Sequence, residues 1–395
     1  MANDASTLRG NWSYPTSIRF GVGRITELPD ACKQLGFKRP LLVTDPGLAK
    51  LAMIQDAVAR NKEAGLPTGL FVDIKGNPVS KNVEDGLKAF REGGYDGIIA
   101  FGGGSALDAA KTIAFMAGQK RPMWDFEDVG DNWTRADPAG IVPTIAVPTT
   151  SGTGSEVGRA SVITNEATHV KKIIFHPKML PSIVISDPAL TVGLPPHVTA
   201  ATGMDALAHC LEAYCAPGFH PLAEGIAVEG MRFVKEALPV AVKDGKNLVA
   251  RAQMMAAASM GATAFQKGLG AIHALSHPVG AVYDSHHGLT NAVVMPYVLE
   301  FNRAAIEAKL TRLAAWLGLP DPSFNAVMAW VLALRKEIGI PHTLKDLGVG
   351  RDRVDELSEM AAVDPSAGGN PIPIGVPELK TMFVASIEGK LAQAA

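Results

Sequence analysis

The sequence predicts two domains of different class, an α/β domain over residues 1–195 and an all-helical domain over residues 196–395. Short apolar runs alternate with segments of helical periodicity as far as residue 190, whereas the later segments have helical periodicity almost throughout. The chain has 395 residues, which exceeds the usual size of a single hydrophobic core. A proline-containing stretch around residues 193–200 is the predicted boundary between the two domains.

The first half of the chain alternates between predicted strands and predicted helices. The strands are expected at residues 17–23, 40–45, 69–74 and 96–101, and the helices at 25–36, 48–65 and 82–94. Repeated strand–helix–strand units imply a parallel sheet with helices on both faces, a Rossmann-like arrangement. Ligands of such sheets bind at the carboxyl ends of the strands.

The segments that follow differ from this alternation. A further apolar strand starts near residue 141 and leads into a loop rich in Thr, Ser and Gly that ends at residue 158. Residues 161–196 contain short runs of Val, Ile and Phe broken by Pro and charge, which predicts hairpin strands. The second half contains the predicted helices 199–216, 220–245, 247–268, 303–318, 324–339 and 376–393.

Composition and charge exclude several classes of protein. Hydrophobic residues make up 47% of the chain and charged residues 19%, which is typical of a compact globular protein. A net charge of −2 without a run of Lys or Arg argues against a nucleic-acid-binding surface. The three cysteines form no CxxC pair, and neither a membrane-spanning apolar run nor an export signal is recognisable. We therefore expect a cytoplasmic protein that contacts neither nucleic acid nor membrane.

A glycine-rich turn connects the strand at 96–101 to the next predicted helix. Gly102, Gly103, Gly104 and Ser105 stand where a helix begins, so unpaired backbone N–H groups and the helix dipole would favour a pyrophosphate group. The turn lacks the GxGxxG pattern, and a tight strand-to-helix connection is the alternative. Asp45 ends an earlier strand, where a carboxylate can accept hydrogen bonds from an adenosine ribose and would repel a 2′-phosphate. Its alternative role is a helix cap or turn residue.

Potential metal ligands gather between residues 205 and 287, in segments that are otherwise small and apolar. Asp205 and His209 are four residues apart, so both project from one face of a helix, and His273 and His277 have the same spacing. His286 and His287 follow. One carboxylate with two or three imidazoles is typical of a zinc or iron site. Histidines that pack in a helical core are the alternative, and spacing alone leaves both open.

Six motifs together carry a resemblance to a known family. FGGGSALDAAK, AVPTTSGTGSEV, ISDPALTVGLPP, DALAH, GAIHALSHPVGA and HHGLTNAVVMPYV occur in the same order in the iron-containing (group III) alcohol dehydrogenases. The chain resembles this family over nearly its whole length. The resemblance implies a dinucleotide-binding domain, a helical domain, a metal in the cleft between them, and hydride transfer between NAD(H) and a small alcohol or aldehyde. The metal would act as a Lewis acid on the substrate oxygen.

The resemblance also implies roles for individual residues. The implied metal ligands are Asp205, His209, His273 and His287, with His277 nearby as a group that transfers a proton. The implied cofactor contacts are Asp45 at the adenosine ribose, Asn77 on the adenine side, Gly103, Gly104 and Ser105 at the pyrophosphate, Thr149 and Thr150 in the loop by the adenine and phosphates, Lys171 at the nicotinamide ribose, and Leu190 and Gly193 beside the adenine. The chain departs from some relatives in having Gly158 and Ala160 after SEV, which leaves the nicotinamide end of the pocket less well defined.

Other functions remain as competing hypotheses. Dehydroquinate synthase and glycerol dehydrogenase resemble this family in architecture and also use NAD with a metal. The synthase needs Lys and Arg around its metal, but residues 259–291 contain only Lys267. Glycerol dehydrogenases use three protein ligands rather than four. A nucleotide-binding regulator without turnover is the non-enzymatic alternative. Fe²⁺ is the expected metal with Zn²⁺ as its alternative, and relatives suggest a homodimer or a higher homo-oligomer.

Overall fold

The computed structural model describes residues 16–168 and 170–391. These residues form two compact units, Pro15–Gly193 and a second unit that begins at Leu194, and each is described by itself. The first 15 residues of the predicted first domain lie outside the described residues. Within the described ranges, no helix combines the length and the apolar character that a membrane crossing requires.

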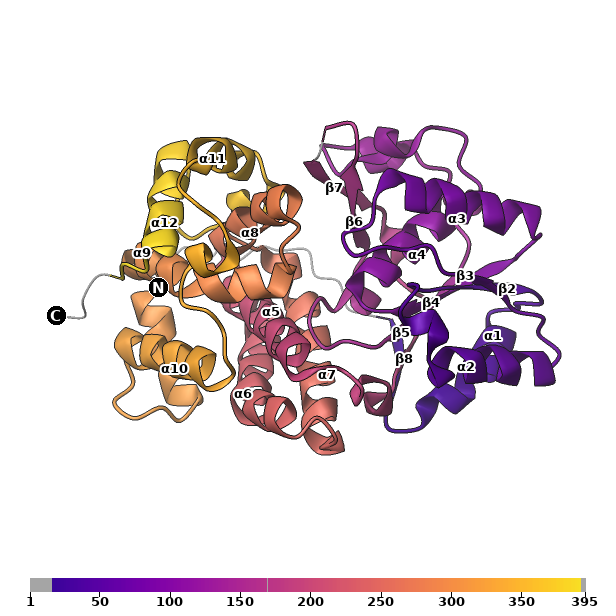
Figure 1. Ribbon diagram of the computed structural model, residues 1–395, viewed down its shortest axis with the longest axis horizontal. Coiled ribbons are helices and arrows are strands. Elements are labelled where there is room, and N and C mark those ends of the chain that lie inside the picture. The colour runs from indigo at the N-terminus through magenta and orange to yellow at the C-terminus, as the bar shows by residue number, and fades with distance from the viewer. Residues whose placement is uncertain (1–15, 169, 392–395) are drawn as a thin grey trace. The chain divides into compact units, whose positions relative to one another are not determined.

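The first unit is built on a six-stranded parallel sheet with the strand order β1-β8-β5-β4-β2-β3 (Figure 1). Its strands are β1 (Ser17–Phe20), β2 (Pro40–Val43), β3 (Gly69–Phe71), β4 (Gly97–Gly102), β5 (Thr144–Pro148) and β8 (Ile183–Ser186). All its strand pairs are parallel, as the alternating pattern predicts. Strands β2, β4 and β5 are buried along their whole length, because helices cover both faces of the sheet.

Four helices cover the two faces of this sheet. On one face α1 (Leu28–Gln34) and α2 (Ala52–Glu63) pack on the sheet through a core that includes Leu28, Ile54 and Phe101. The opposite face carries α3 (Ser80–Glu92) and α4 (Gly104–Met116), which Figure 1 shows on the other side of the strands. The prediction of helices on both faces is confirmed.

The hairpin prediction for residues 161–196 is confirmed in one part and wrong in another. Strands β6 (Ala160–Asn165) and β7 (Val170–Phe175) do form an antiparallel pair apart from the main sheet. However, β8 pairs in parallel with both β1 and β5, inside the main sheet. All four of its residues are buried, which is the property of a central parallel strand. The prediction was wrong for β8 because Pro181 and Pro188 lie on either side of it, and prolines around a short apolar segment are typical of a hairpin strand between loops.

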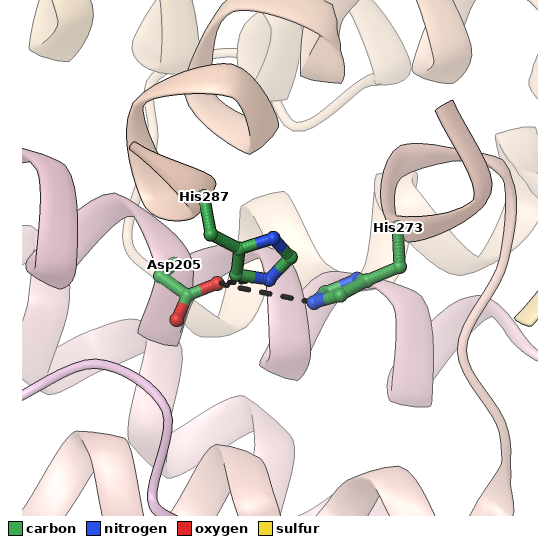
Figure 2. Close-up of side chains that lie close together, drawn as sticks. All are labelled: Asp205, His273 and His287. Carbon is green, nitrogen blue, oxygen red and sulfur yellow. Dashed lines mark ion pairs between the residues drawn. The ribbon is translucent and has the colours of Figure 1, made fainter. Parts of the chain in front are cut away.

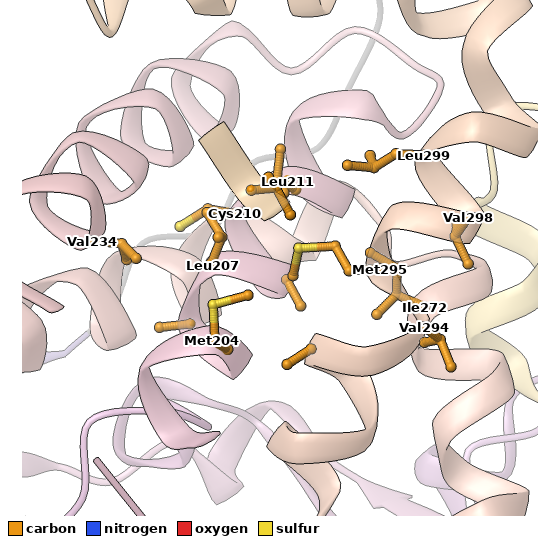
Figure 3. Packing of buried hydrophobic residues seen from close by; sticks show 14 of the residues in the cluster. Met204, Leu207, Cys210, Leu211, Val234, Ile272, Val294, Met295, Val298 and Leu299 are labelled. Carbon is orange, nitrogen blue, oxygen red and sulfur yellow. The ribbon is translucent and has the colours of Figure 1, made fainter. Parts of the chain in front are cut away.

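The second unit is helical within the residues described. Its helices are α5 (Pro196–Cys215), α6 (Pro221–Lys243), α7 (Leu248–Ala264), α8 (Ala271–Tyr283), α9 (His287–Trp316), α10 (Phe324–Glu337), α11 (Val354–Ala362) and α12 (Val376–Glu388). One continuous core joins them, and Figure 3 shows part of it, where Leu207 and Leu211 of α5 pack near Ile272 and Met295. The predicted all-helical character is confirmed.

Three helices of this unit differ from the predicted list, from which α8 is absent although the spacing of His273 and His277 is helical. Helix α9 begins at His287, 16 residues before the predicted start at residue 303. Pro296 lies inside it, and a proline in a helix removes one backbone hydrogen bond and normally marks an end. Here the surrounding residues are almost all buried, so packing outweighs the cost of the proline. Helix α11 was not predicted, because it has only nine residues, of which three are acidic.

Candidate functional site

Three of the predicted metal ligands come together in the second unit. Asp205 lies on α5, His273 on α8, and His287 is the first residue of α9 (Figure 2). Their ligand atoms all lie within 4.8 Å of one another. Asp205 Oδ1 is 3.8 Å from His273 Nε2 and 3.5 Å from His287 Nε2. Three helices that are distant in sequence therefore direct one oxygen and two nitrogen donors towards one point.

The fourth predicted ligand, His209, lies beside this group. It is one turn after Asp205 on α5, and its Nε2 is 3.9 Å from Asp205 Oδ1. Its ring stacks on that of His273, with a centroid separation of 4.7 Å and an interplanar angle of 18°. Phe265 covers His209 at a centroid separation of 5.0 Å. The structure thus brings all four predicted ligands into one cluster, in which three residues are buried and His287 is partly exposed.

The spacing of these atoms fits a divalent metal. Bonds of about 2.1 Å in a tetrahedral shell separate neighbouring ligand atoms by roughly 3.4 Å. The Asp205 Oδ1 distances to the three imidazoles lie between 3.5 and 3.9 Å. Three imidazole nitrogens and one carboxylate oxygen also form a donor set that zinc and iron accept.

Two glycines allow the helices to approach closely enough for this cluster to form. A Cβ on Gly288 would lie 2.3 Å from the carbonyl oxygen of Ala201 and 2.9 Å from Asp205 Cβ, so only glycine fits there. A Cβ on Gly261 of α7 would lie 2.9 Å from His209 Cβ. The glycine directly after His287 therefore brings the start of α9 against α5 beside Asp205.

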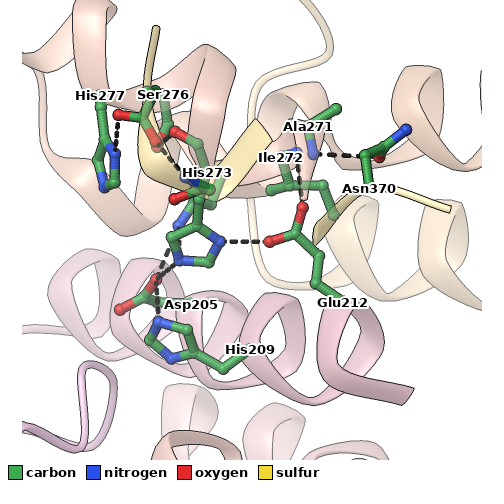
Figure 4. Close-up of polar contacts among 12 residues, drawn as sticks. Asp205, His209, Glu212, Ala271, Ile272, His273, Ser276, His277 and Asn370 are labelled. Atoms are coloured by element: carbon green, nitrogen blue, oxygen red, sulfur yellow. Dashed lines mark hydrogen bonds and ion pairs between the residues drawn. The ribbon is translucent and has the colours of Figure 1, made fainter. Parts of the chain in front are cut away.

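Glu212, which was not predicted, contacts His273 of the cluster at Nδ1, the ring nitrogen that does not face Asp205. It is buried on α5, one turn beyond His209, and its Oε2 accepts a hydrogen bond from His273 Nδ1 at 2.5 Å (Figure 4). Burial alone would lower the pKa of His273, but the adjacent Glu212 and Asp205 carboxylates outweigh it and raise that pKa above its usual value. The helical spacing of 205, 209 and 212 is a signal by which this residue could have been found.

Asn291 is a second polar residue that was not predicted. Its Nδ2 donates to Asp205 Oδ1 at 2.8 Å and lies 3.3 Å from His273 Nε2 and 3.1 Å from His287 Nε2. It is fully buried on α9, one turn after His287. The amide group therefore contacts the ligand atoms of all three helices.

His277 lies next to the cluster and is paired with a carboxylate. Its ring stacks on His287 with a centroid separation of 5.2 Å, and its Nδ1 lies 2.7 Å from Asp364 Oδ2. Burial tends to raise the pKa of Asp364, but the charge and hydrogen bond of His277 outweigh this effect and lower it. His286, the other candidate at this corner, accepts from the Leu289 N–H through Nδ1 and caps α9.

The candidate ligand site of the first unit lies at the carboxyl ends of β2 and β4, where the chain changes the direction in which it adds strands to the sheet. From β2 the chain goes outward to β3, and then crosses to the other side of β2 to form β4, β5 and β8. Open α/β sheets bind ligands in the crevice at this point, beyond the carboxyl ends of the strands. Asp45 follows β2 and the glycine turn follows β4, and these two strands are direct neighbours.

The glycine turn has the geometry of an anion cradle. Gly103 is the N-cap of α4, and Gly104 and Ser105 form its first turn. A Cβ on Gly104 would lie 2.6 Å from the Thr153 side chain, and a Cβ on Gly103 would lie 3.3 Å from that of Thr150. Thr149 donates its N–H to the carbonyl of Gly102 at 3.0 Å. The Thr-rich loop thus lies against the glycine turn, as its position at the end of β5 predicts.

Asp45 forms the cap that was its alternative role. Its Oδ1 accepts the N–H groups of Gly47 and Leu48, both at 2.9 Å. A Cβ placed on Gly102 would lie 3.8 Å from the other carboxylate oxygen, Oδ2. The cap therefore holds the Asp45 carboxylate beside the start of the glycine turn.

The remaining predicted cofactor residues have different surroundings. Leu190 is buried in the core beneath the sheet, and a Cβ on Gly193 would meet nothing within 4 Å. Lys171 Nζ donates to Asn77 Oδ1 at 2.8 Å, which joins β7 to the loop after β3. Asn77 was expected on the adenine side and Lys171 at the nicotinamide ribose. Their direct contact places both side chains at the same location.

A buried ion pair, which was not predicted, links α4 to the loop that follows β5. Lys111 Nζ lies 3.3 Å from Asp108 Oδ1 and donates to the Ser155 carbonyl at 3.0 Å. Asp108 Oδ2 in turn accepts from the Val162 N–H at 2.9 Å. Burial lowers the pKa of Lys111, which the charge of Asp108 opposes. The motif SALDAAK contains both residues, one helical turn apart.

Comparisons with known proteins cover both units. The family described as iron-containing alcohol dehydrogenase matches residues 15–188, and the C-terminal region of the Fe-containing alcohol dehydrogenase family matches residues 199–387. The chain is 39% identical to a 4-hydroxybutyrate dehydrogenase of Cupriavidus necator over 385 residues, 95% of this chain and 99% of that protein. It is 37% identical to a 1,3-propanediol dehydrogenase of Citrobacter freundii, over 91% and 94% of the two chains.

Solved structures are similar over the same extent. The crystal structure of a 1,3-propanediol oxidoreductase superposes with a TM-score of 0.91 at 35% identity, covering 95% of this chain and 99% of the other. An alcohol dehydrogenase from Oenococcus oeni gives a TM-score of 0.90 at 30% identity, over 95% and 100% of the chains.

Proposed function

Because the chain belongs to the iron-containing alcohol dehydrogenase family, we propose that Asp205, His209, His273 and His287 hold the metal at which it oxidises a small alcohol. The chain is an oxidoreductase that acts on alcohols, and its family membership implies a metal and NAD(H). The single observation that carries the residue assignment is the convergence of donor atoms from α5, α8 and α9. Fe²⁺ is the proposed metal, and Zn²⁺ is the alternative that the same donors accept.

The proposed binding site for NAD lies in the first unit. The N–H groups at Gly103, Gly104 and Ser105 would hold the pyrophosphate, with Thr149 and Thr150 beside it. Asp45 would bind the adenosine ribose and disfavour a 2′-phosphate. The other proposed contacts are Leu190 and Gly193 near the adenine and the joined pair Asn77 and Lys171. Because these two side chains contact each other, we propose that both lie beside the same part of the cofactor, the nicotinamide ribose.

The chemistry divides between the bound groups and the residues of the chain. A divalent metal supplies Lewis acidity that lowers the pKa of an alcohol hydroxyl, and NAD accepts the hydride. The four residues would hold the metal that supplies this Lewis acidity, and the Phe265 ring, which lies next to His209, would help to exclude water. His277, oriented through Nδ1 by Asp364, has Nε2 available to take up the hydroxyl proton.

Three further proposals concern the protein as a whole. We propose that the domains divide at residues 195 and 196, that the protein is cytoplasmic, and that it forms a homodimer or a higher homo-oligomer. The substrate class is small alcohols and the corresponding aldehydes or ketones, in line with the names of the relatives. A lyase of the dehydroquinate synthase type is disfavoured, because Lys267 is held by Glu224 at 2.7 Å instead of serving a phosphorylated substrate.

The test is a substrate screen with metal-replete protein. Protein purified without oxygen and loaded with Fe²⁺ is assayed with NAD and a panel that includes methanol, 1,3-propanediol and 4-hydroxybutyrate, and with NADH and the matching aldehydes. We expect NADH formation with at least one small alcohol. If no compound of the panel supports turnover in either direction, although the metal is bound, the dehydrogenase assignment of this chain is refuted.

A further inference from the structure

Helix α5 contributes more to the metal centre than two ligands. Asp205, His209 and Glu212 lie on one face of this helix, and all three are at least nine-tenths buried. The first two direct their donor atoms to the cluster, whereas Glu212 reaches the far side of a ligand that belongs to another helix. Figure 4 shows its carboxylate between the His273 ring and the start of α8.

Both oxygens of Glu212 have separate partners on α8. Oε1 accepts the backbone N–H of Ile272 at 2.7 Å, and Oε2 contacts His273 Nδ1 at 2.5 Å. A carboxylate can only accept hydrogen bonds, so His273 must carry its proton on Nδ1. Nε2 then carries the lone pair, and it lies 3.3 Å from Asn291 Nδ2 and 3.8 Å from Asp205 Oδ1. At His287, by comparison, the Ser276 hydroxyl lies 3.2 Å from Nδ1.

We propose that Glu212 is a positioning residue of the metal centre, which fixes the tautomer and the ring orientation of His273 so that Nε2 is ready to bind the metal. This inference rests on the metal site proposed above. Carboxylate partners of this kind change metal affinity by about 10- to 100-fold when they are removed. Glu212 itself does not touch the metal or the substrate.

The substitution Glu212→Gln tests this role directly. The Ile272 N–H can only donate, so the amide oxygen of the glutamine must face Ile272. Its NH₂ group must then face His273 Nδ1, which moves the imidazole proton to Nε2, the atom needed for the metal. The variant keeps the size of the side chain and the contact with the start of α8. It therefore separates the orientation of His273 from the general anchoring of the helix.

The matched control is Asn370→Ala. Asn370 Oδ1 accepts the N–H of Ala271 at 3.2 Å, so it holds the neighbouring residue of the same helix start without contacting His273. We expect Glu212→Gln to bind Zn²⁺ or Co²⁺ about 10- to 100-fold more weakly than the wild type, measured by competition with a chromophoric chelator. For Asn370→Ala we expect a lower melting temperature and a metal affinity within about threefold of the wild type, because the ligand tautomer is intact.

A second readout does not depend on the metal. In metal-free protein labelled at histidine nitrogen, the signals of His273 should indicate a proton on Nδ1 in the wild type and on Nε2 in Glu212→Gln. Equal metal affinities of the wild type and Glu212→Gln, or equal losses in both variants, would overturn the role of Glu212. Failure of the wild type to bind any metal would instead refute the proposed function.

Discussion

The candidate metal cluster and the glycine-rich turn are built from different parts of the chain. The cluster consists of side chains from three helices, among which Asp205 and His273 are both 2% exposed and His287 is partly exposed. The turn consists of backbone at the ends of parallel strands, and its glycines have no side chains to contribute. A backbone site tolerates changes that leave the turn intact, whereas a side-chain site depends on each donor and on the residues that orient it.

The largest effect should follow from removing a metal ligand. His273→Ala is expected to lower alcohol oxidation by about 10³-fold or more, because metal Lewis acidity is worth several kcal/mol in the transition state. Binding of NADH, followed by its fluorescence, should stay within about twofold of the wild type. A parallel loss of NADH affinity would mean that the two sites do not act separately.

The next largest effect should come from the buried ion pair in the first unit. Lys111→Met leaves the Asp108 carboxylate and the Ser155 carbonyl without their cation, which should lower the free energy of unfolding by about 3 kcal/mol. Urea denaturation measures this change. The affinity for NADH should fall as the Thr-rich loop loosens, while the metal content stays the same. If Lys111→Met loses metal while its affinity for NADH is unchanged, the ion pair supports the metal site and not the cofactor site, contrary to this account.

A smaller effect is expected where helices α5 and α9 meet. Gly288→Ala places a methyl group 2.3 Å from the Ala201 carbonyl oxygen, and overpacking of this kind costs about 1–3 kcal/mol. The start of α9 must shift, so His287 moves relative to Asp205 and metal affinity should fall. Gly193→Ala is the matched control, since its added Cβ meets nothing within 4 Å. Equal metal affinity in both variants would contradict this account of helix spacing.

The smallest effect concerns the choice of cofactor. Asp45→Asn keeps the oxygen that accepts from Gly47 and Leu48 but removes the negative charge. Repulsion between two charges near a protein surface is worth about 1–4 kcal/mol at short range. We therefore expect the preference for NAD over NADP, measured as the ratio of kcat/KM values, to fall by about tenfold. An unchanged ratio would leave Asp45 with its capping role alone.

The sequence pointed to the proposed ligands more clearly than to the residues that contact them. Spacing at helical intervals made Asp205, His209 and His273 candidates, because neighbours on a helix face follow from the chain itself, and the family resemblance implied their role as ligands. The partner Asp364 lies after α11, on an element that carries no proposed ligand, so only the packing of the fold brings it to the site. Glu212 and Asn291 differ, since each lies one turn beyond a proposed ligand on the same helix, His209 on α5 and His287 on α9.

The same distinction applies to the fold. Strands β2 and β4 were predicted because each is a short apolar run that is followed by a segment of helical periodicity, which is a local pattern. Strand β8 was assigned to a hairpin, since its place between β1 and β5 depends on pairing with residues about 40 and 165 positions away. The early start of α9 was missed for a related reason, because burial by neighbouring helices outweighs the local preference of Pro296.

Titration of metal-free protein with Fe²⁺ in the absence of oxygen tests the central claim most directly. If Asp205, His209, His273 and His287 form one catalytic metal centre, NAD-linked alcohol oxidation should rise in proportion to bound metal and level off at one ion per chain. The variant His287→Ala should bind no ion at this affinity. Full alcohol oxidation without metal, or one tightly bound ion in His287→Ala, would contradict the account.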